Sequence, residues 1–471
     1  MKPSIAISMG FLQIFTLSAQ RGIIKLSKEI NTMLVAAFAF YSAVISFLAN
    51  SYALIRQVPL SLLFIIPIFL FVNLFAGCSL IKTKRRSLKI CCHGTVLLVC
   101  FCISIIVSVI YHIILAVKTI PGSYPAFIGS LVFCCCVNFV FFWNGIICAY
   151  LTSTQLGIKI RVIGIICGMI PIVNLIVLFF ILKTTIAECR EEAKREEINN
   201  QRRSLKICAT KYPILLVHGV FFRDTQFFNY WGRIPYELEA NGATIFYGNH
   251  HSASSVADSA AELKLRILEI LSETGAEKVN IIAHSKGGLD CRYAISKLGI
   301  GDRVASLTTI NTPHRGCLFA DYLLGKIPSY IKDKVADTYN ATLRKFGEPN
   351  PDFLAAVNDL TESYCTQLDH EMLTPEGVYG QSVGSVLTKA TNGKFPLNFT
   401  YYLVKHFSGE NDGLVDEKSF IWGENHILLR PTEERGISHG DMIDLNRENF
   451  HGFDVRDFYV NLVNDLKNKG F

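Results

Sequence analysis

Charged residues are scarce in this chain, and long stretches of its first 182 residues contain none. Only 18% of the 471 residues are charged and 50% are hydrophobic, which is apolar for a soluble protein. Five charge-free stretches are long enough to cross a hydrocarbon core of about 30 Å, and they lie near 33–55, 59–81, 95–117, 126–153 and 162–182. The lack of charge inside them argues against an ion or proton path, and so against a transporter.

Metal-binding and nucleic-acid-binding patterns are also missing. Eleven of the 15 cysteines precede residue 190, and the other four are Cys208, Cys291, Cys317 and Cys365. Their spacing matches neither a zinc site nor a disulfide framework, so we expect no cofactor bound through them. The polar half has no basic run that alternates with stacking aromatics, so we expect no nucleic-acid partner despite the net charge of +7.

These patterns divide the chain into four parts. Residues 1–32 form a basic, amphipathic segment, 33–182 a transmembrane region of about five helices, 183–208 a charged helical linker, and 209–471 a polar domain. The linker pairs Glu with Lys or Arg at spacings of three and four residues, as a solvated helix does. We therefore expect a multi-pass membrane protein that contacts the lipid bilayer. The sequence carries no indication of an oligomeric state.

The positive charges of the short loops predict how the membrane region is oriented. The loops rich in positive charge contain Arg21, Lys25, Lys28, Lys82, Lys84, Arg85, Arg86, Lys89, Lys159 and Arg161. The other loops hold only Arg56 and Lys118. By the positive-inside rule the polar domain is extracytoplasmic. Seven Lys or Arg residues within 183–206 favour the opposite side, but the earlier loops largely set the orientation.

Strand and helix patterns alternate after residue 209. Apolar strands are predicted at 213–217, 243–247, 279–284, 304–310, near 401–404 and around 427–429. Apolar residues at helical spacing predict a helix at 255–274. Strands that alternate with helices in short units favour a mostly parallel sheet with helices on both faces. The predicted fold class is therefore α/β, preceded by an all-helical transmembrane region.

The most informative stretch runs from Val279 to Gly288. An apolar strand breaks into a tight turn at Ser285, after which Gly287 and Gly288 open a helix. Small residues two positions before and after the serine, Ala283 and Gly287, permit the sharp turn that holds a nucleophilic serine clear of a sheet. Glycine is the usual residue at position 283, so Ala283 is a mild departure.

A nucleophilic serine needs a base, and the base needs an acid that orients it. In folds where a strand-to-helix turn presents the serine, the base and the acid follow the serine in the chain. The candidate bases are His426, His439 and His451. His439 is favoured because it lies in a loop after the strand around 427–429, whereas His426 opens that strand and His451 begins the final amphipathic helix. The candidate acids are Glu410, Asp412 and Asp416, near a turn after the strand predicted at 401–404.

Several blocks of the polar half resemble those of a known family. The blocks are residues 212–219, 230–244, 275–285, 311–316, 411–415 and 438–441. In this order they are similar to blocks of bacterial triacylglycerol lipases, which belong to the α/β-hydrolase superfamily. The resemblance implies an α/β-hydrolase domain with Ser285 as nucleophile, His439 as base and Asp412 as acid. In this fold the expected oxyanion donors are the backbone N–H groups of Val220 and Lys286.

The same resemblance raises the question of a calcium ion. The resembling lipases have a calcium ligand two residues beyond the catalytic histidine, a place that Asp441 occupies here. Leu445 stands at the position of their glutamine ligand and cannot coordinate, and their other carboxylate has no clear counterpart. Asp441 as the cap of the following helix is the favoured interpretation, so we expect no metal cofactor.

Residues 317–396 match no strand–helix unit and interrupt the resemblance. Their apolar stripe consists of Tyr322, Leu323, Leu324, Ile327, Tyr330 and Ile331. An insertion at this point, beyond the carboxyl ends of the strands, would cover the site as a lid or cap. The stripe could equally belong to the core.

These features favour a membrane-anchored serine hydrolase of lipase type. We expect it to cleave carboxylic esters of lipids, such as acylglycerols, through a Ser-His-Asp triad and an acyl-enzyme. One alternative is a phospholipase or lipid acyltransferase with the same triad. A second alternative is a membrane sensor that keeps the fold without catalysis, and a transporter with an accessory domain is the least supported.

Overall fold

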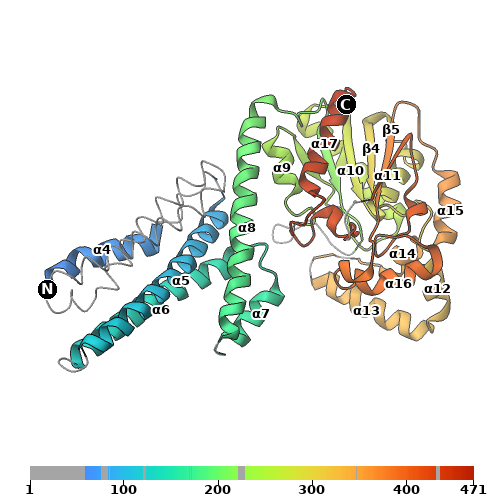
Figure 1. Cartoon of the computed structure of the whole chain (residues 1–471). Coiled ribbons are helices and arrows are strands. Elements are labelled where there is room, and N and C mark those ends of the chain that lie inside the picture. Colours follow the sequence, from blue (N-terminus) through green and yellow to red (C-terminus); the bar gives the residue numbers. More distant parts are fainter. Residues whose placement is uncertain are drawn as a thin grey trace. The chain divides into compact units, whose positions relative to one another are not determined.

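The computed structural model describes residues 59–75, 83, 85–119, 124–168, 170, 172–220, 229–345, 347–348, 350–430 and 435–471. The chain divides into two compact units, residues 1–198 and 199–471 (Figure 1). The predicted N-terminal segment 1–32 and the first predicted span, 33–55, lie outside the described residues.

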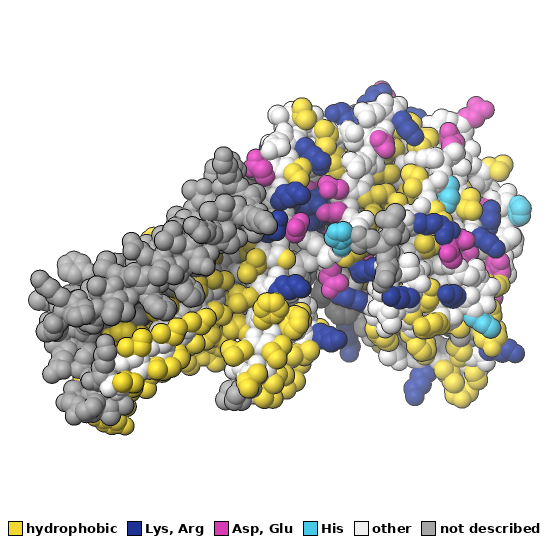
Figure 2. Space-filling view, in the orientation of Figure 1, with side chains coloured by type: hydrophobic (Ala, Val, Ile, Leu, Met, Phe, Trp, Pro, Cys, Tyr) yellow, Lys and Arg dark blue, Asp and Glu magenta, His cyan; other side chains and the backbone are white. Residues whose placement is uncertain are grey.

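The first unit consists of helices in its described part. They are α4 (Pro59–Phe75), α5 (Arg86–Thr119), α6 (Tyr124–Thr152), α7 (Ile158–Cys167) and α8 (Val173–Arg202), the last of which continues into the second unit. Residues 86–117 of α5 and 124–152 of α6 are long and apolar enough to cross a membrane. Their surfaces carry exposed apolar side chains such as Ile113, Phe139 and Leu151. Hydrophobic side chains cover much of the described surface of the first unit in Figure 2.

Glycines let α5 and α6 pack closely. A Cβ atom on Gly94 would lie 2.6 Å from the Cβ atom of Cys148, and one on Gly145 would lie 2.9 Å from Cγ of Leu98. Small residues at such contacts bring helix backbones together, which is how apolar helices associate in lipid.

The structure differs from the sequence prediction for one span of this unit. The span predicted at 162–182 is not one helix, because α7 ends at Cys167 and α8 begins at Val173. Gly168 and Pro171 lie within the predicted span, and proline disfavours helical backbone at and before its position. The linker predicted at 183–208 is helical as far as Arg202, and its helix is continuous with the apolar residues before it, since α8 runs without a break from Val173 to Arg202.

The second unit is built on a six-stranded parallel sheet, which confirms the predicted α/β fold class. Its strands are β1 (Ile214–Val217), β2 (Ile245–Tyr247), β3 (Val279–His284), β4 (Val304–Ile310), β5 (Tyr379–Ser385) and β6 (Asn425–Leu429). Their order is β2-β1-β3-β4-β5-β6. All neighbours are parallel, so the carboxyl ends of all six strands lie at the same edge.

Helices cover both faces of this sheet. Alternate residues of β1 enter two different cores, since Ile214 and Leu216 belong to one and Leu215 and Val217 to the other. The first core also holds side chains of α9 (Ile234–Ala240) and α17 (Val455–Asn468). The second holds side chains of α10 (Val256–Thr274) and α11 (Lys286–Lys297). This arrangement fits the α/β-hydrolase fold that the sequence resemblance implies.

Further helices lie between β4 and β6. The α-helices are α12 (Leu318–Lys326), α13 (Ser329–Lys345), α14 (Phe353–Asn358), α15 (Glu362–Glu371) and α16 (Leu397–Ser408). The short 3-10 helices of the unit are η2 (Arg203–Leu205), η3 (Gly301–Arg303), η4 (Ala390–Asn392), η5 (Glu417–Phe420) and η6 (Asp441–Ile443).

Three boundaries in this unit differ from the sequence predictions. The insertion predicted at 317–396 contains β5, a strand of the central sheet, so the inserted helices α12 to α15 end before it. The strand predicted near 401–404 is part of helix α16. His451 does not begin the last helix, because Asp454 caps α17 through a hydrogen bond from the Arg456 N–H.

Candidate active site

Ser285 occupies the sharp turn between β3 and α11. Its backbone has φ 55° and ψ −132°, a conformation that costs on the order of 1–3 kcal/mol and persists only where neighbours hold it. The Ser285 N–H donates to the Ile310 carbonyl at 2.9 Å, and the Thr312 hydroxyl donates to the Ser285 carbonyl at 2.8 Å. A Cβ atom on Gly287 would lie 2.4 Å from the His218 carbonyl oxygen. The turn therefore requires glycine at position 287.

Asp412 and His439 form a direct pair. His439 Nδ1 and Asp412 Oδ2 are 2.6 Å apart, and the His439 N–H donates to the Asp412 carbonyl at 2.9 Å. The Asp412 side chain is fully buried. It also accepts from the N–H groups of Leu414 and Val415, each at 2.8 Å, and from Asn311 Nδ2 at 2.6 Å. These donors fix the carboxylate, which in turn fixes the orientation of the imidazole.

A chain of hydrogen bonds joins this pair to the serine turn. The Gly219 N–H donates to the Tyr230 hydroxyl at 3.0 Å, and that hydroxyl lies 2.7 Å from Nδ1 of His284. His284 Nε2 lies 3.2 Å from the His439 carbonyl oxygen, and the two imidazole rings are 4.4 Å apart at their centroids. Since His284 directly precedes Ser285, these contacts link the serine turn to the Asp412–His439 pair. Nothing in the sequence marked Tyr230 beyond its place in the block 230–244, because its contact with His284 exists only in the folded unit.

The two expected oxyanion donors flank the serine. A Cβ atom on Gly219 would lie 2.8 Å from Cβ of Ser285, so the residue before Val220 lies directly beside Ser285. Lys286 is the first residue of α11, where backbone N–H groups have no partner within the helix. Both positions agree with a role in binding developing negative charge.

The side chain of Lys286 enters the interior. Only 1% of it is exposed, and its ammonium group lies 2.7 Å from Asp290 Oδ1 and 3.1 Å from the Ser259 hydroxyl. Burial raises the pKa of Asp290 to about 6, against the lowering effect of Lys286. Asp290 Oδ2 is 3.6 Å from His250, whose ring stacks on His218 at 4.0 Å. A buried ion pair therefore lies beneath the histidine pair His218–His250.

Buried histidines make the stability of this unit sensitive to acid. Burial lowers the pKa of His218 to about 3 and holds the pKa values of His284 and His314 well below their usual range. Below about pH 6.5 the unfolded chain binds protons at these imidazoles and the folded chain does not. The free energy of unfolding therefore decreases as the pH is lowered below about 6.5, by about 1.4 kcal/mol per pH unit for each histidine.

We expect the melting temperature to decrease as the pH is lowered from about 7 to about 5. The raised pKa of Asp290 opposes this trend, since its folded form takes up a proton near pH 6, but one carboxyl group offsets only about one of the three histidines. Thermal unfolding followed by tryptophan fluorescence measures the effect. The exposed His406, replaced by Gln, is the matched control and leaves the pH dependence unchanged. A melting temperature that stays constant or rises over this range contradicts the assignment.

The other candidate residues have different partners. Asp416 caps η5 by accepting from the N–H groups of Lys418 and Ser419, and Glu410 pairs with Arg430. His426 Nδ1 lies 2.9 Å from the Ser382 hydroxyl. His451 lies in an exposed turn before α17. None of these contacts places the four residues in the pair formed by Asp412 and His439.

Asp441 braces the turn that carries His439. Its Oδ2 accepts from the Ser438 N–H at 2.9 Å and from the Ser438 hydroxyl at 2.8 Å, and the Arg435 guanidinium lies 3.1 Å from Oδ1. Asp441 is the first residue of η6 and not the cap expected from the sequence. The side chains do not fit a calcium ion, because the Arg435 guanidinium pairs with the Asp441 carboxylate and the Leu445 side chain has no oxygen.

The comparisons with known proteins agree with this fold. No protein-family model matches the chain. Over 165 residues the chain is 34% identical to a triacylglycerol lipase of Pseudarthrobacter phenanthrenivorans, an alignment that covers 32% of this chain and 51% of the relative. A triacylglycerol lipase of Vibrio cholerae is 40% identical over 129 residues, which cover 27% of this chain and 41% of the relative. The chain thus spans about half the length of these curated relatives, or less.

More distant similarities extend further along the chain. Triacylglycerol lipase 2 of Saccharomyces cerevisiae is 28% identical over 262 residues, which cover 51% of this chain and 74% of the relative. Among solved structures, Staphylococcus hyicus lipase has a TM-score of 0.44 at 17% identity, and the match covers 55% of this chain and 97% of that chain. About a third of the chain is thus similar in sequence to triacylglycerol lipases.

Proposed function

We propose that this chain is a membrane-anchored carboxylic ester hydrolase of lipase type. The observation that carries the proposal is the connected arrangement of Ser285 in its strained turn with the Asp412–His439 pair. The similarity to triacylglycerol lipases over about a third of the chain supports it.

In the proposed mechanism the Ser285 hydroxyl attacks the ester carbonyl while His439 Nε2 accepts its proton. Asp412 orients the imidazole and balances the charge of the imidazolium. The backbone N–H groups of Val220 and Lys286 stabilise the oxyanion, and each such donor typically contributes about 3 kcal/mol to the transition state. His439 then protonates the leaving alcohol. Water attacks the acyl-enzyme with His439 as base and releases the carboxylic acid.

The proposed substrate is an ester of a lipid, such as an acylglycerol. Helices α5 and α6 support anchoring, which would hold the site near a bilayer where such esters are concentrated. We further propose that the catalytic unit is extracytoplasmic, on the evidence of the alternating basic loops.

The proposal is tested with the purified full chain in a neutral detergent. We expect it to hydrolyse a monomeric p-nitrophenyl butyrate and to release fatty acid from dispersed diacylglycerol, with the rate corrected for the uncatalysed reaction. Added glycerol serves as an acyl acceptor, and fatty acid is expected to remain the main product. Absence of hydrolysis of both esters would refute the proposed activity, and acylated glycerol as the main product would make the chain an acyltransferase.

A further inference from the structure

The segment from Lys389 to Ser408 displays large aromatic side chains to solvent. Phe395, Phe399 and Tyr402 are 85%, 75% and 65% exposed. Their spacing of four and then three residues places them on one side of α16 and the turn before it. The opposite side of the helix is fixed to its own unit, because Tyr401 and Val404 are buried and the Tyr401 hydroxyl donates to the Thr388 carbonyl. Within the part of the unit that the structure describes, the side chains of this face are therefore mostly uncovered.

The charge of this segment has only one sign. Residues 389–408 contain three lysines, Lys389, Lys394 and Lys405, and no aspartate or glutamate. Lys394 pairs with Glu448, whereas the ammonium group of Lys405 lies over the Tyr401 ring at 5.5 Å from its centroid. Exposed aromatic rings beside lysines suit the interface of a bilayer with anionic headgroups, where the rings enter the headgroup region and the ammonium groups meet phosphate.

The aromatic segment is joined to the candidate active site. The Thr400 hydroxyl donates to the Gly413 carbonyl, and Asn411 Nδ2 donates to the Tyr401 carbonyl at 3.4 Å, so α16 is fixed to the turn that contains Asp412. A Cβ atom on Gly440 would lie 3.7 Å from Leu397 Cδ1, which places the start of α16 beside His439. A surface bound to this segment would therefore lie close to the reacting groups.

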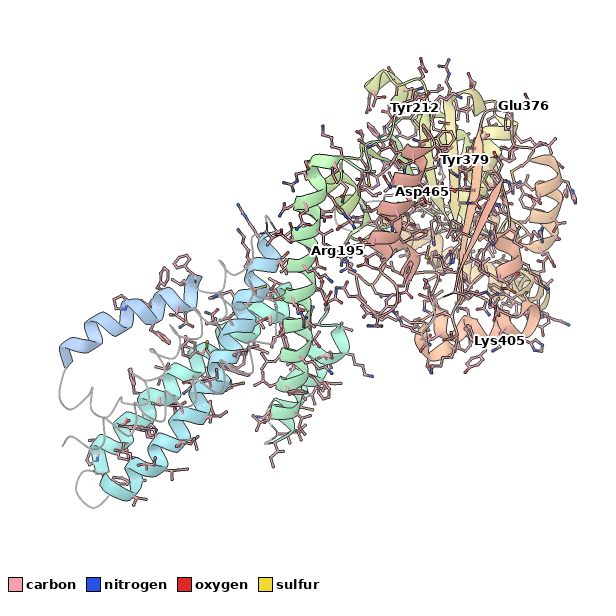
Figure 3. All side chains as sticks on the ribbon, turned by 45° about the horizontal axis from the view of Figure 1, so that its top comes forward. Arg195, Tyr212, Glu376, Tyr379, Lys405 and Asp465 are labelled. Carbon is pink, nitrogen blue, oxygen red and sulfur yellow. The ribbon has the colours of Figure 1, made fainter. Side chains whose placement is uncertain are left out.

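The segment lies at the carboxyl ends of the strands. Figure 3 shows Lys405 at the lower end of the catalytic unit, whereas Tyr212 and Tyr379, which mark the amino ends of β1 and β5, lie toward the upper end. Helix α12 extends the apolar surface, since the half-exposed Tyr322 has its ring 5.0 Å from that of Phe407. Hydrophobic and basic side chains occur together at this end of the unit in Figure 2.

We propose that residues 389–408 form a docking surface by which the catalytic unit binds a lipid surface that carries anionic headgroups. This inference rests on the proposed function, because it supplies the route by which a lipid ester reaches Ser285. The aromatic rings enter the headgroup region, and Lys405 contacts the headgroup phosphates.

The test is co-flotation of the full chain with lipid vesicles. The chain is held in nanodiscs of neutral lipid and mixed with phosphatidylcholine vesicles that contain one-fifth phosphatidylglycerol. The double variant Phe399→Ser/Tyr402→Ser is expected to reduce the bound fraction by at least about tenfold, because two large apolar side chains are lost from the interface. Lys405→Glu is expected to weaken binding to these vesicles and not to pure phosphatidylcholine. Leu265→Ser is the matched control, since Leu265 is 68% exposed on α10, outside the segment.

Other outcomes separate the two proposals. Unchanged flotation of the double variant, with an unchanged melting temperature, overturns the docking surface. If nanodiscs that hold the wild type associate with one another, and the double variant abolishes this association, the partner of residues 389–408 is a second copy of the chain. This outcome also overturns the proposed lipid docking surface. The ratio of hydrolysis of vesicle-borne ester to that of p-nitrophenyl butyrate is expected to fall in the double variant. If the wild type hydrolyses neither ester, the proposed function fails, while flotation still reports on docking.

Discussion

The Ser285→Ala variant is expected to lose ester hydrolysis by a factor on the order of 10⁵–10⁶ in kcat. The variant removes only the hydroxyl oxygen, which is the nucleophile in the proposed mechanism. Alanine keeps the Cβ atom, and the backbone bonds of the turn to Ile310 and Thr312 do not involve the hydroxyl. The measurement is kcat and KM for p-nitrophenyl butyrate, together with the melting temperature of each protein.

Ser306→Ala is the matched control for this experiment. Ser306 is buried on β4, and its hydroxyl donates to Asn280 Oδ1 at 2.7 Å, away from the serine turn. Its loss is expected to lower the stability by about 1 kcal/mol and to leave kcat unchanged. Retention of wild-type activity by Ser285→Ala would exclude the proposed nucleophile. Equal loss of activity in both variants would indicate a folding defect.

The Asp412→Asn variant is expected to lower kcat by about 10⁴-fold. The carboxylate accepts from His439, Asn311 and the N–H groups of Leu414 and Val415. An amide in its place directs an N–H group toward one of these donors, so the imidazole is held in the wrong tautomer. The charge that balances the imidazolium is also lost. The decrease is expected in kcat, with little change in KM for the soluble ester.

Asp416→Asn and Glu410→Gln serve as controls for the acid. Both residues lie close in sequence to Asp412, but Asp416 caps η5 and Glu410 pairs with Arg430 at the surface. We expect both variants to stay within about threefold of the wild-type kcat. Should Asp416→Asn lose activity while Asp412→Asn keeps it, the acid would be Asp416.

The sheet and the serine turn could largely be predicted from local sequence. The predicted strand 279–284 is β3, and the turn after it follows from Gly287, whose place beside the His218 carbonyl excludes any side chain. The strands at 213–217 and 304–310 were also recognisable, because β1 is wholly apolar and β4 is rich in β-branched residues. In these segments local pattern and tertiary environment agree.

Strand β5 could not be recognised, because its residues are small and polar. Tyr379–Ser385 contains two glycines whose missing side chains make room for Trp422 and Phe420. A Cβ atom on Gly384 would lie 2.3 Å from the Phe420 ring. Since the apolar partners come from another part of the chain, no periodicity marks the strand.

Helix α16 was predicted as a strand for the opposite reason. Its run of aromatic and β-branched residues has high strand propensity, yet Tyr401 and Val404 are buried at a spacing of three residues, as a helix requires. The contacts of the candidate site that the sequence did not predict are also of two kinds, local in sequence and formed only by folding. The Lys286–Asp290 pair has helical i, i+4 spacing and could be recognised, whereas the link from Tyr230 to His284 exists only in the folded unit.

The most direct test of the proposed mechanism is covalent labelling of the serine nucleophile. The full chain is incubated with a fluorophosphonate, digested and analysed by mass spectrometry. We expect a single phosphonylated residue, Ser285, with labelling abolished in Ser285→Ala and much slower in Asp412→Asn. A wild-type chain that remains unlabelled while folded, or that is labelled at another serine, would contradict the assignment of Ser285 as the nucleophile.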